Sequence, residues 1–181
     1  MRRHGIQVEV TDHKFFMEKA LEEAEKALAQ GEFPVGCVMA CKNKLLVTSS
    51  RTGSTGQRPN ELDHAEIAAL RNLAKFEEEL GKKINRKKIK LFCTLEPCLM
   101  CLGAVLLSGV GEIVYAYEDV MGGAALSDLT LFTPLYRNRE ISIVSNIMRK
   151  ESLELFRAFF SNPENNYLKG SLLARYTLSQ S

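Results

Sequence analysis

Short apolar runs alternate with segments of helical periodicity along most of this chain, and that alternation limits the possible folds more than any other feature. Apolar residues recur about every 3.6 positions from residue 15 to 28, so we expect a first helix that Asp12 caps and Gly31 ends. Two strand-like runs, 35–40 and 45–48, follow with a Lys42-Asn43 turn between them. Helices over 64–75 and 97–108 then alternate with strands over 89–94, 112–117 and 140–145. This order predicts a three-layer α/β/α sandwich around a central, mixed, five-stranded sheet.

The length of 181 residues fits a single domain. We expect a core over about residues 12–160 and a C-terminal helical extension over about 161–181. Leucine and aromatic residues recur with helical spacing in this last part of the chain, from Leu153 to Leu173. Such a stripe is typical of a helix face packed on the core, and a base-stacking surface is the less favoured interpretation.

Composition indicates a cytoplasmic protein with no membrane partner. No apolar run approaches the roughly 18–20 residues of a membrane helix, and residues 1–10 lack the continuous apolar segment of a signal peptide. Five cysteines, an odd number, fit a reducing compartment better than a disulfide framework.

The net charge of +2 and the isoelectric point of about 8.3 are compatible with nucleic-acid binding but do not argue for it. Residues 81–90, GKKINRKKIK, carry six cations and no acid. They could form a loop that contacts phosphates, or a solvated connection ahead of a strand. The second interpretation is favoured because charge runs usually form solvated surface.

Cys98 and Cys101 follow Pro97 at a spacing that three kinds of structure share: a redox dithiol, one corner of a metal site, or a core helix face. If Pro97 opens a helix, both thiols lie near its first turn and on the same side. The helix dipole lowers thiol pKa values there, which suits a disulfide oxidoreductase and a zinc site equally well.

His64 distinguishes these interpretations, because it starts another predicted helix after another predicted loop. Loops of this kind meet at the carboxyl ends of the strands in an open α/β sheet. One imidazole and two thiolates, from His64, Cys98 and Cys101, would leave the fourth position of a tetrahedral zinc ion open for water, as in catalytic zinc sites. Glu66 could accept a proton from that water. Taken alone, Glu66 is also explained as an acidic residue favoured in the first turn of a helix.

The combination of His64-Ala65-Glu66 with Pro97-Cys98-x-x-Cys101 resembles the zinc-dependent cytidine deaminase-like superfamily. Within it, the chain from about residue 15 to 160 resembles the bacterial tRNA adenosine deaminases. Four segments carry this resemblance: GEFPVGCV (31–38), HAEIAALR (64–71), TLEPCLMCLGA (94–104) and YEDVMGGAALSDL (117–129).

The resemblance implies a hydrolase that converts adenosine to inosine at the wobble position of the tRNA anticodon loop. It implies a Zn²⁺ cofactor held by His64, Cys98 and Cys101, with Glu66 as the catalytic residue that moves the protons. It also implies a homodimer in which the partner helps to complete the substrate groove. The positions that it suggests for substrate binding are Pro34, Val35, Ser50, Ala65 and Asp119.

Two departures from the family pattern keep a second substrate class open. Ser50 and Arg51 stand where the family commonly has Asn-Arg, so Ser50 or Asn60 would have to replace that asparagine. The segment after Phe160 lacks the strongly basic character usual in the family. The cations of residues 81–90 could compensate only if they lie beside the substrate groove.

A deaminase of a free base or nucleoside, of the guanine, cytosine, adenosine or cytidine type, is therefore the alternative. A noncatalytic zinc-binding partner subunit is a weaker alternative, since such a partner would be expected to lose Glu66. A thiol-redox enzyme is weaker still, because it would leave both His64 and Glu66 unexplained.

Overall fold

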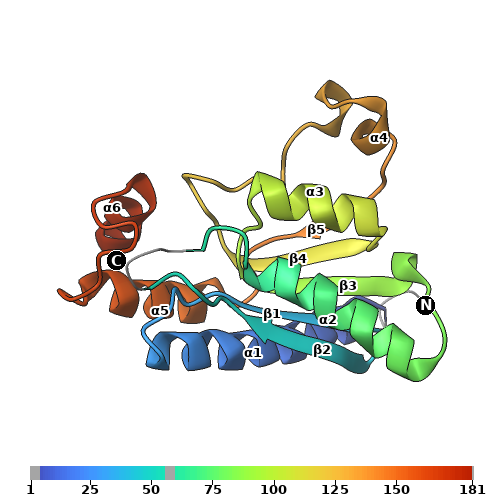
Figure 1. Ribbon diagram of the computed structural model, residues 1–181, viewed down its shortest axis with the longest axis horizontal. Helices are drawn as coiled ribbons and strands as arrows, with labels where there is room; N and C mark the ends of the chain where they lie inside the picture. The colour runs from blue at the N-terminus through green and yellow to red at the C-terminus, as the bar shows by residue number, and fades with distance from the viewer. Residues whose placement is uncertain (1–4, 56–59, 181) are drawn as a thin grey trace.

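The computed structural model describes residues 5–55 and 60–180, and its centre is one five-stranded sheet (Figure 1). The strands lie in the order β2-β1-β3-β4-β5. β1 runs antiparallel to β2 and to β3, whereas β3, β4 and β5 are parallel to one another. Their bounds are Gly36–Cys41 (β1), Lys44–Ser50 (β2), Ile89–Leu95 (β3), Glu112–Tyr117 (β4) and Ser142–Val144 (β5). The mixed five-stranded sheet that the sequence predicts is confirmed.

Helices cover both faces of the sheet, as expected for three layers (Figure 1). α1 and α5 pack on one face, α2 and α3 lie over the other, and α6 packs on α5. A short helix, α4, lies in a segment that projects away from the sheet. The helix bounds are Gly5–Ala29 (α1), Ala65–Leu80 (α2), Leu99–Ser108 (α3), Pro134–Arg137 (α4), Arg149–Ser161 (α5) and Leu172–Ser179 (α6). Two 3₁₀ turns, Arg86–Lys88 (η1) and Leu129–Leu131 (η2), complete the described elements.

The alternation of side chains along the strands divides the core in two. Val38, Phe92 and Val114 point to one face, where they pack with residues of α1. The neighbouring positions Met39 and Leu91 point to the other face, where they pack with residues of α2 and α3. Because both faces are covered, the central strands read as continuous apolar runs in the sequence.

The aromatic residues of α5 are core residues, as their spacing predicts, whereas Tyr167 and Leu168 lie in turns between α5 and α6 and not on a helix. Phe156 and Phe159 on α5 are buried and pack edge-on against Phe33, at ring-centroid distances of 5.1 and 5.2 Å. Leu173 on α6 is buried in the same cluster. Within the part of the chain that the structure describes, no helix is long and apolar enough to cross a membrane.

Two predicted helix starts are wrong. α1 spans Gly5–Ala29, so the described helix already includes Asp12 and does not begin after it. α3 begins at Leu99, two residues after Pro97. Cys98 stays extended because it forms a β-bridge with Gly123, which keeps Pro97 outside the helix.

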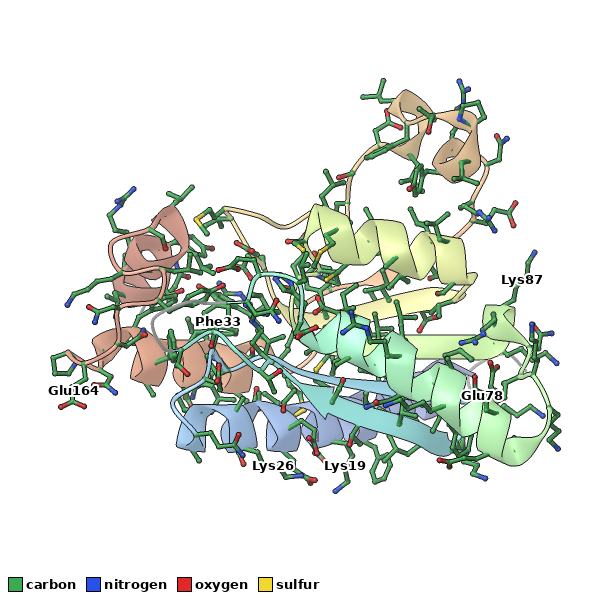
Figure 2. The ribbon with its side chains drawn as sticks, viewed as in Figure 1. Lys19, Lys26, Phe33, Glu78, Lys87 and Glu164 are labelled. Atoms are coloured by element: carbon green, nitrogen blue, oxygen red, sulfur yellow. The ribbon has the colours of Figure 1, made fainter. Side chains whose placement is uncertain are left out.

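The basic segment 81–90 is a short connection with one turn of 3₁₀ helix that leads from α2 into β3. Figure 2 shows Lys87 at one end of the molecule, with Phe33 and Glu164 toward the other end. The segment precedes β3, whereas Pro97 and Cys98 follow β3. Its exposed cations, Lys82, Lys83, Lys87 and Lys88, therefore lie at the opposite end of β3 from the two thiols, as expected for a solvated connection ahead of the strand.

Gly36 is required for the contact between β1 and α1. A Cβ atom at this position would lie 1.9 Å from the Ala20 carbonyl oxygen and 2.5 Å from the Ala24 nitrogen. Both are backbone atoms of a helix, so the crowding could be relieved only by moving α1 away from the sheet.

We expect Gly36→Ala to lower the free energy of unfolding by about 1–3 kcal/mol or more, as overpacking does in a close-packed core. The measurement is urea unfolding followed by circular dichroism. Gly103→Ala is the matched control, because its Cβ would meet only Tyr136 at an ordinary 3.8 Å. Equal midpoints for the two variants would contradict the role assigned to Gly36.

Candidate active site

His64 and Cys98 occupy equivalent positions at the starts of two helices. His64 is the N-cap residue of α2 and Cys98 is the N-cap residue of α3. Both have an extended backbone, and neither side chain makes a capping hydrogen bond. The imidazole and the thiol are therefore free to face each other, and Cys101 joins them from the first turn of α3.

The three side chains form a group with the dimensions of a zinc site. His64 Nδ1 lies 3.6 Å from Cys98 Sγ and 3.5 Å from Cys101 Sγ, and all three donor atoms lie within 4.8 Å of one another. Zinc bonds of about 2.3 Å to sulfur and about 2.0–2.1 Å to nitrogen give an N···S edge of about 3.6 Å in a tetrahedron. The donor set therefore fits a zinc ion with one position left for another ligand.

Hydrogen bonding shifts the pKa values of the two thiols in opposite directions. A hydrogen bond with Cys101, reinforced by His64 and opposed by burial, lowers the pKa of Cys98 to about 4. The same bond, together with burial, raises the pKa of Cys101 above its ordinary value. In the metal-free protein, the Cys98 thiolate is thus the form that is present at neutral pH.

Glu66 lies one residue inside α2 and is 3% exposed. Burial raises the pKa of its carboxyl group above the ordinary value, although nearby His64 opposes this shift. A carboxyl group in this position can hold a proton closer to neutral pH than an exposed glutamate can. Such a group is suited to proton transfer beside a metal.

A cavity of about 200 Å³ adjoins the metal-binding group. Its walls come from the loop before β1, the ends of β2 and β3, the start of α2, the loop after β4 and the C-terminal segment. Figure 1 shows where these elements lie in the fold. The lining residues are Phe33, Val35, Arg51, Glu61, His64, Ala65, Glu66, Leu95, Glu96, Cys98, Asp119, Met121, Gly122, Tyr167, Leu168 and Leu173. A cavity with apolar walls and a few convergent polar groups is typical of a small-molecule site.

The loop after β4 is held against the cavity by two carboxylates. Glu96 accepts hydrogen bonds from the backbone N–H groups of Asp119 and Ala125. Asp119 accepts from the N–H groups of Met121 and Gly122 at 2.9 and 3.0 Å. Asp119 therefore shapes its own turn at the rim of the cavity.

The structure brings together most of the residues that the sequence singles out. His64, Cys98, Cys101 and Glu66 converge at one end of the sheet, and three of the expected substrate-binding residues, Val35, Ala65 and Asp119, line the cavity.

Pro34 and Ser50 do not line it. Pro34 accepts a hydrogen bond from Thr94, and Ser50 pairs with Gly36 at the end of β2. Asn60 donates to Asp63 and stabilises the turn before α2, outside the cavity wall.

Sequence reasoning missed several lining residues that come from distant parts of the chain. Arg51 and Glu61 each stand directly beside a residue, Ser50 or Asn60, that had been considered. Tyr167 and Leu168 lie in the C-terminal extension, where their spacing predicts only a core stripe. Arg51 alone falls in a family motif, as the second residue of the Asn-Arg position, and the places of Tyr167 and Leu168 depend on how the last part of the chain folds back over α5.

Comparison with known proteins gives concordant matches. The profile of the "Cytidine and deoxycytidylate deaminase zinc-binding region" matches residues 10–117. The tRNA-specific adenosine deaminase of Bacillus subtilis (strain 168) is 30% identical over 154 residues, which cover 83% of this chain and 90% of the relative. The enzyme of the same name from Haemophilus influenzae is 35% identical over 144 residues, covering 80% of each chain.

Solved structures agree. One from a study of A-to-I editing by tRNA:A34 deaminases is 32% identical and has a TM-score of 0.61, covering 78% of this chain and 98% of that chain. The guanine deaminase from Nitrosomonas europaea has a TM-score of 0.56 at 22% identity, covering 79% and 81%. The second match shows a shared fold only.

We expect iodoacetamide to modify Cys98 of the metal-free protein at a rate that is nearly constant from about pH 5.5 to 8. The folded pKa of about 4 makes Cys98 a thiolate across this range. A free cysteine derivative, with a pKa of about 8.5, should react about tenfold faster per pH unit over the same range.

The measurement is peptide mass spectrometry after timed alkylation. Prior addition of zinc should protect both Cys98 and Cys101. A rate for Cys98 that rises steeply up to pH 8, or that zinc leaves unchanged, would contradict the assignment.

Proposed function

The chain belongs to the cytidine and deoxycytidylate deaminase zinc-binding family, among the relatives of the tRNA-specific adenosine deaminases, and we propose that it deaminates adenosine to inosine at the wobble position of tRNA. The observation that carries a deaminase function is the convergence of His64, Cys98 and Cys101 beside the buried Glu66. Identity of about 30% over more than four-fifths of the chain to tRNA-specific adenosine deaminases supports the substrate.

In this proposal His64, Cys98 and Cys101 hold the zinc ion. When bound, the ion would supply Lewis acidity, which would lower the pKa of a water molecule in the cavity toward neutrality. Glu66 accepts the water proton and delivers it to the ring nitrogen beside the attacked carbon. It then takes the proton of the new hydroxyl group on C6 and passes it to the amino group, so that the C6–N bond breaks, ammonia leaves and the 6-oxo group of inosine forms. Its buried position, which raises its pKa, suits a group that must hold and release a proton in turn.

The cavity walls position the base. Val35 and Ala65 are buried apolar residues of the lining and would contact the ring. Asp119 would lie near the sugar or backbone of the nucleotide. Pro34 and Ser50 would act indirectly, by fixing the backbone on which Val35 and Arg51 stand. Because the cavity is small, the target base must leave its stack to enter it.

One observation favours a second candidate, a deaminase of a free base or nucleoside. Tyr167, Leu168 and Leu173 of the C-terminal segment form part of the cavity wall. A groove of about 720 Å³ shares Tyr167 and Leu168 with the cavity and contains the carboxylates of Glu61 and Glu164. Carboxylates beside the entrance suit a neutral substrate better than a polyanion.

The apolar outer face of α3 supports a homodimer. Leu99 and Leu107 on α3 are 56% and 46% exposed, and Leu126 and Leu131 on the projecting segment are 72% and 84% exposed. Large exposed apolar patches usually mark interaction sites, and Leu99 and Leu107, two helical turns apart, lie on the same side of α3. We propose that a second copy of the chain covers it, in a cytoplasmic enzyme that has access to tRNA.

The experiment that tests the substrate is ammonia release by zinc-loaded protein. It is offered a tRNA anticodon stem-loop with adenosine at the wobble position, and separately adenine, guanine, cytosine and their nucleosides. We expect the stem-loop to be turned over and to yield inosine. Turnover of a free base or nucleoside, with the stem-loop untouched, would establish the second candidate instead.

Glu66→Gln is the matched control for chemistry. We expect it to lower kcat by about 10²–10⁴-fold, as loss of a general acid–base group does, while the protein still binds one equivalent of zinc. Zinc content is measured by atomic spectroscopy. Retained turnover would remove Glu66 from the mechanism, and lost zinc would leave its role structural.

For the dimer, we expect Leu107→Glu to give a monomer, because it places a charge on the exposed apolar side of α3. The molecular mass from light scattering should fall from twice the chain mass to the chain mass of 20.3 kDa. Leu178→Glu on α6, where Leu178 is 48% exposed, is the matched control and should remain dimeric. A monomeric wild-type protein would refute the proposal.

A further inference from the structure

Arg51 is a buried cation in the wall of the cavity. Its side chain follows directly after β2 and is 2% exposed. Among the described residues of the cavity lining, Arg51 is the only lysine or arginine. Its backbone N–H donates to the Val35 carbonyl at 2.8 Å, so the position of the residue does not depend on its side chain.

The terminal nitrogens of this guanidinium lack hydrogen-bond acceptors. Neither Nη1 nor Nη2 has a partner, although both are inaccessible to solvent. Glu61, whose side chain is 62% exposed, forms an ion pair with Nη2 at 3.5 Å but without hydrogen-bond geometry. The guanidinium carbon lies 6.0 Å from the ring centroid of Tyr167.

An arrangement of this kind is unfavourable for the protein alone. Burying a charge whose donors are unpaired is destabilising, and replacing such a group with an apolar one of similar size is often neutral or stabilising. The surrounding fold therefore gains little from Arg51. The unpaired donors would be satisfied by an acceptor that enters the cavity.

We propose that Arg51 is a substrate-binding residue that donates hydrogen bonds to a neutral acceptor atom of the nucleoside unit in the cavity. The proposal rests on the deaminase function proposed above, but it does not depend on whether that unit belongs to tRNA. The family resemblance suggests Ser50 as a substrate contact, and the structure assigns that role to the next residue, Arg51.

The charges of the cavity favour a neutral acceptor over a phosphate. The same lining holds the single arginine and four acidic residues, Glu61, Glu66, Glu96 and Asp119. A phosphate would meet this negative surface, whereas a ring nitrogen or a sugar oxygen would not. The base and the sugar are the two possible sources of the acceptor.

The C-terminal segment keeps Arg51 in place. The Tyr167 hydroxyl donates to Glu61 at 2.9 Å, and the Tyr167 ring packs edge-on against Phe33 at 5.4 Å. These contacts hold Glu61 and the aromatic ring beside the guanidinium. Tyr167 and Glu61 are therefore positioning residues, and Arg51 is the residue that would touch the substrate.

The test is Arg51→Met, which keeps the length of the side chain but removes its charge and its donors. We expect KM for the substrate that the wild-type enzyme turns over to rise by roughly 10- to 100-fold, the value of a hydrogen bond to a charged group, with kcat nearly unchanged. The thermal midpoint should be equal to that of the wild type or higher. Arg157→Met, on the exposed side of α5, is the matched control and should change neither quantity.

Adenine, adenosine, adenosine 5′-monophosphate and the stem-loop, compared as substrates or competitive inhibitors, locate the acceptor. Weaker binding of all four would place it on the base, and weaker binding of all but adenine would place it on the sugar. An effect confined to the two phosphorylated ligands would overturn the neutral acceptor.

Unchanged KM, or a midpoint lowered by more than about 2–4 °C, which corresponds to about 1 kcal/mol for a chain of this size, would make Arg51 structural and refute the proposal. The midpoint decides this even if no ligand of the panel binds. Failure of the stem-loop to react in the wild type would refute the tRNA substrate and leave the inference on Arg51 standing.

Discussion

The side chain of Ser49 joins the three elements that surround the metal-binding group. Its hydroxyl donates to the Ala65 carbonyl at 2.8 Å and lies 3.3 Å from the Cys37 carbonyl. One buried hydroxyl thus connects β2 with β1 and with the first residue of α2. His64 and Glu66 flank Ala65, so both depend on this contact for their positions. On the α3 side, the Cys98–Gly123 bridge has the same effect, because it fixes Cys98 in an extended conformation.

Burial and the helix termini act in opposite directions on the groups of the site. The starts of α2 and α3 direct free N–H groups and positive dipole ends toward the cluster, which favours thiolates. Burial favours neutral forms, and it dominates at Glu66, whose pKa is raised. A site that must hold a cation on two sulfurs and also keep a carboxyl group able to carry a proton needs both effects. The fold supplies both effects at the start of α2, where His64 stands at the helix terminus and Glu66, two residues later, is buried.

The sequence predicts the sheet, the order of the layers and the metal-binding group, because all three follow from local patterns. Period and turn residues mark the strands, and the spacing of His64, Glu66, Cys98 and Cys101 carries the chemistry. The helix starts were less predictable, since a β-bridge to Gly123 decides where α3 begins. The cavity wall was the least predictable part. Residues from both sides of the sheet and from the last twenty positions of the chain form it, and those tertiary contacts leave no periodic trace in the sequence.

The C-terminal segment forms part of the cavity wall, although it carries few of the basic residues that the family pattern would place there. After Phe160 the described chain has only Lys169 and Arg175 as cations. It folds over α5, and a 3.0 Å hydrogen bond between the hydroxyl groups of Thr177 on α6 and Tyr117 on β4 links it to the sheet. The segment is thus part of the cavity wall and offers only two cations to a phosphate backbone. The exposed lysines of residues 82–88 lie at the other end of β3, so within one chain they could meet only a distant part of a large RNA. Recognition near the reacting base must then depend on shape and hydrogen bonds, which gives the unpaired donors of Arg51 more weight than counterion release.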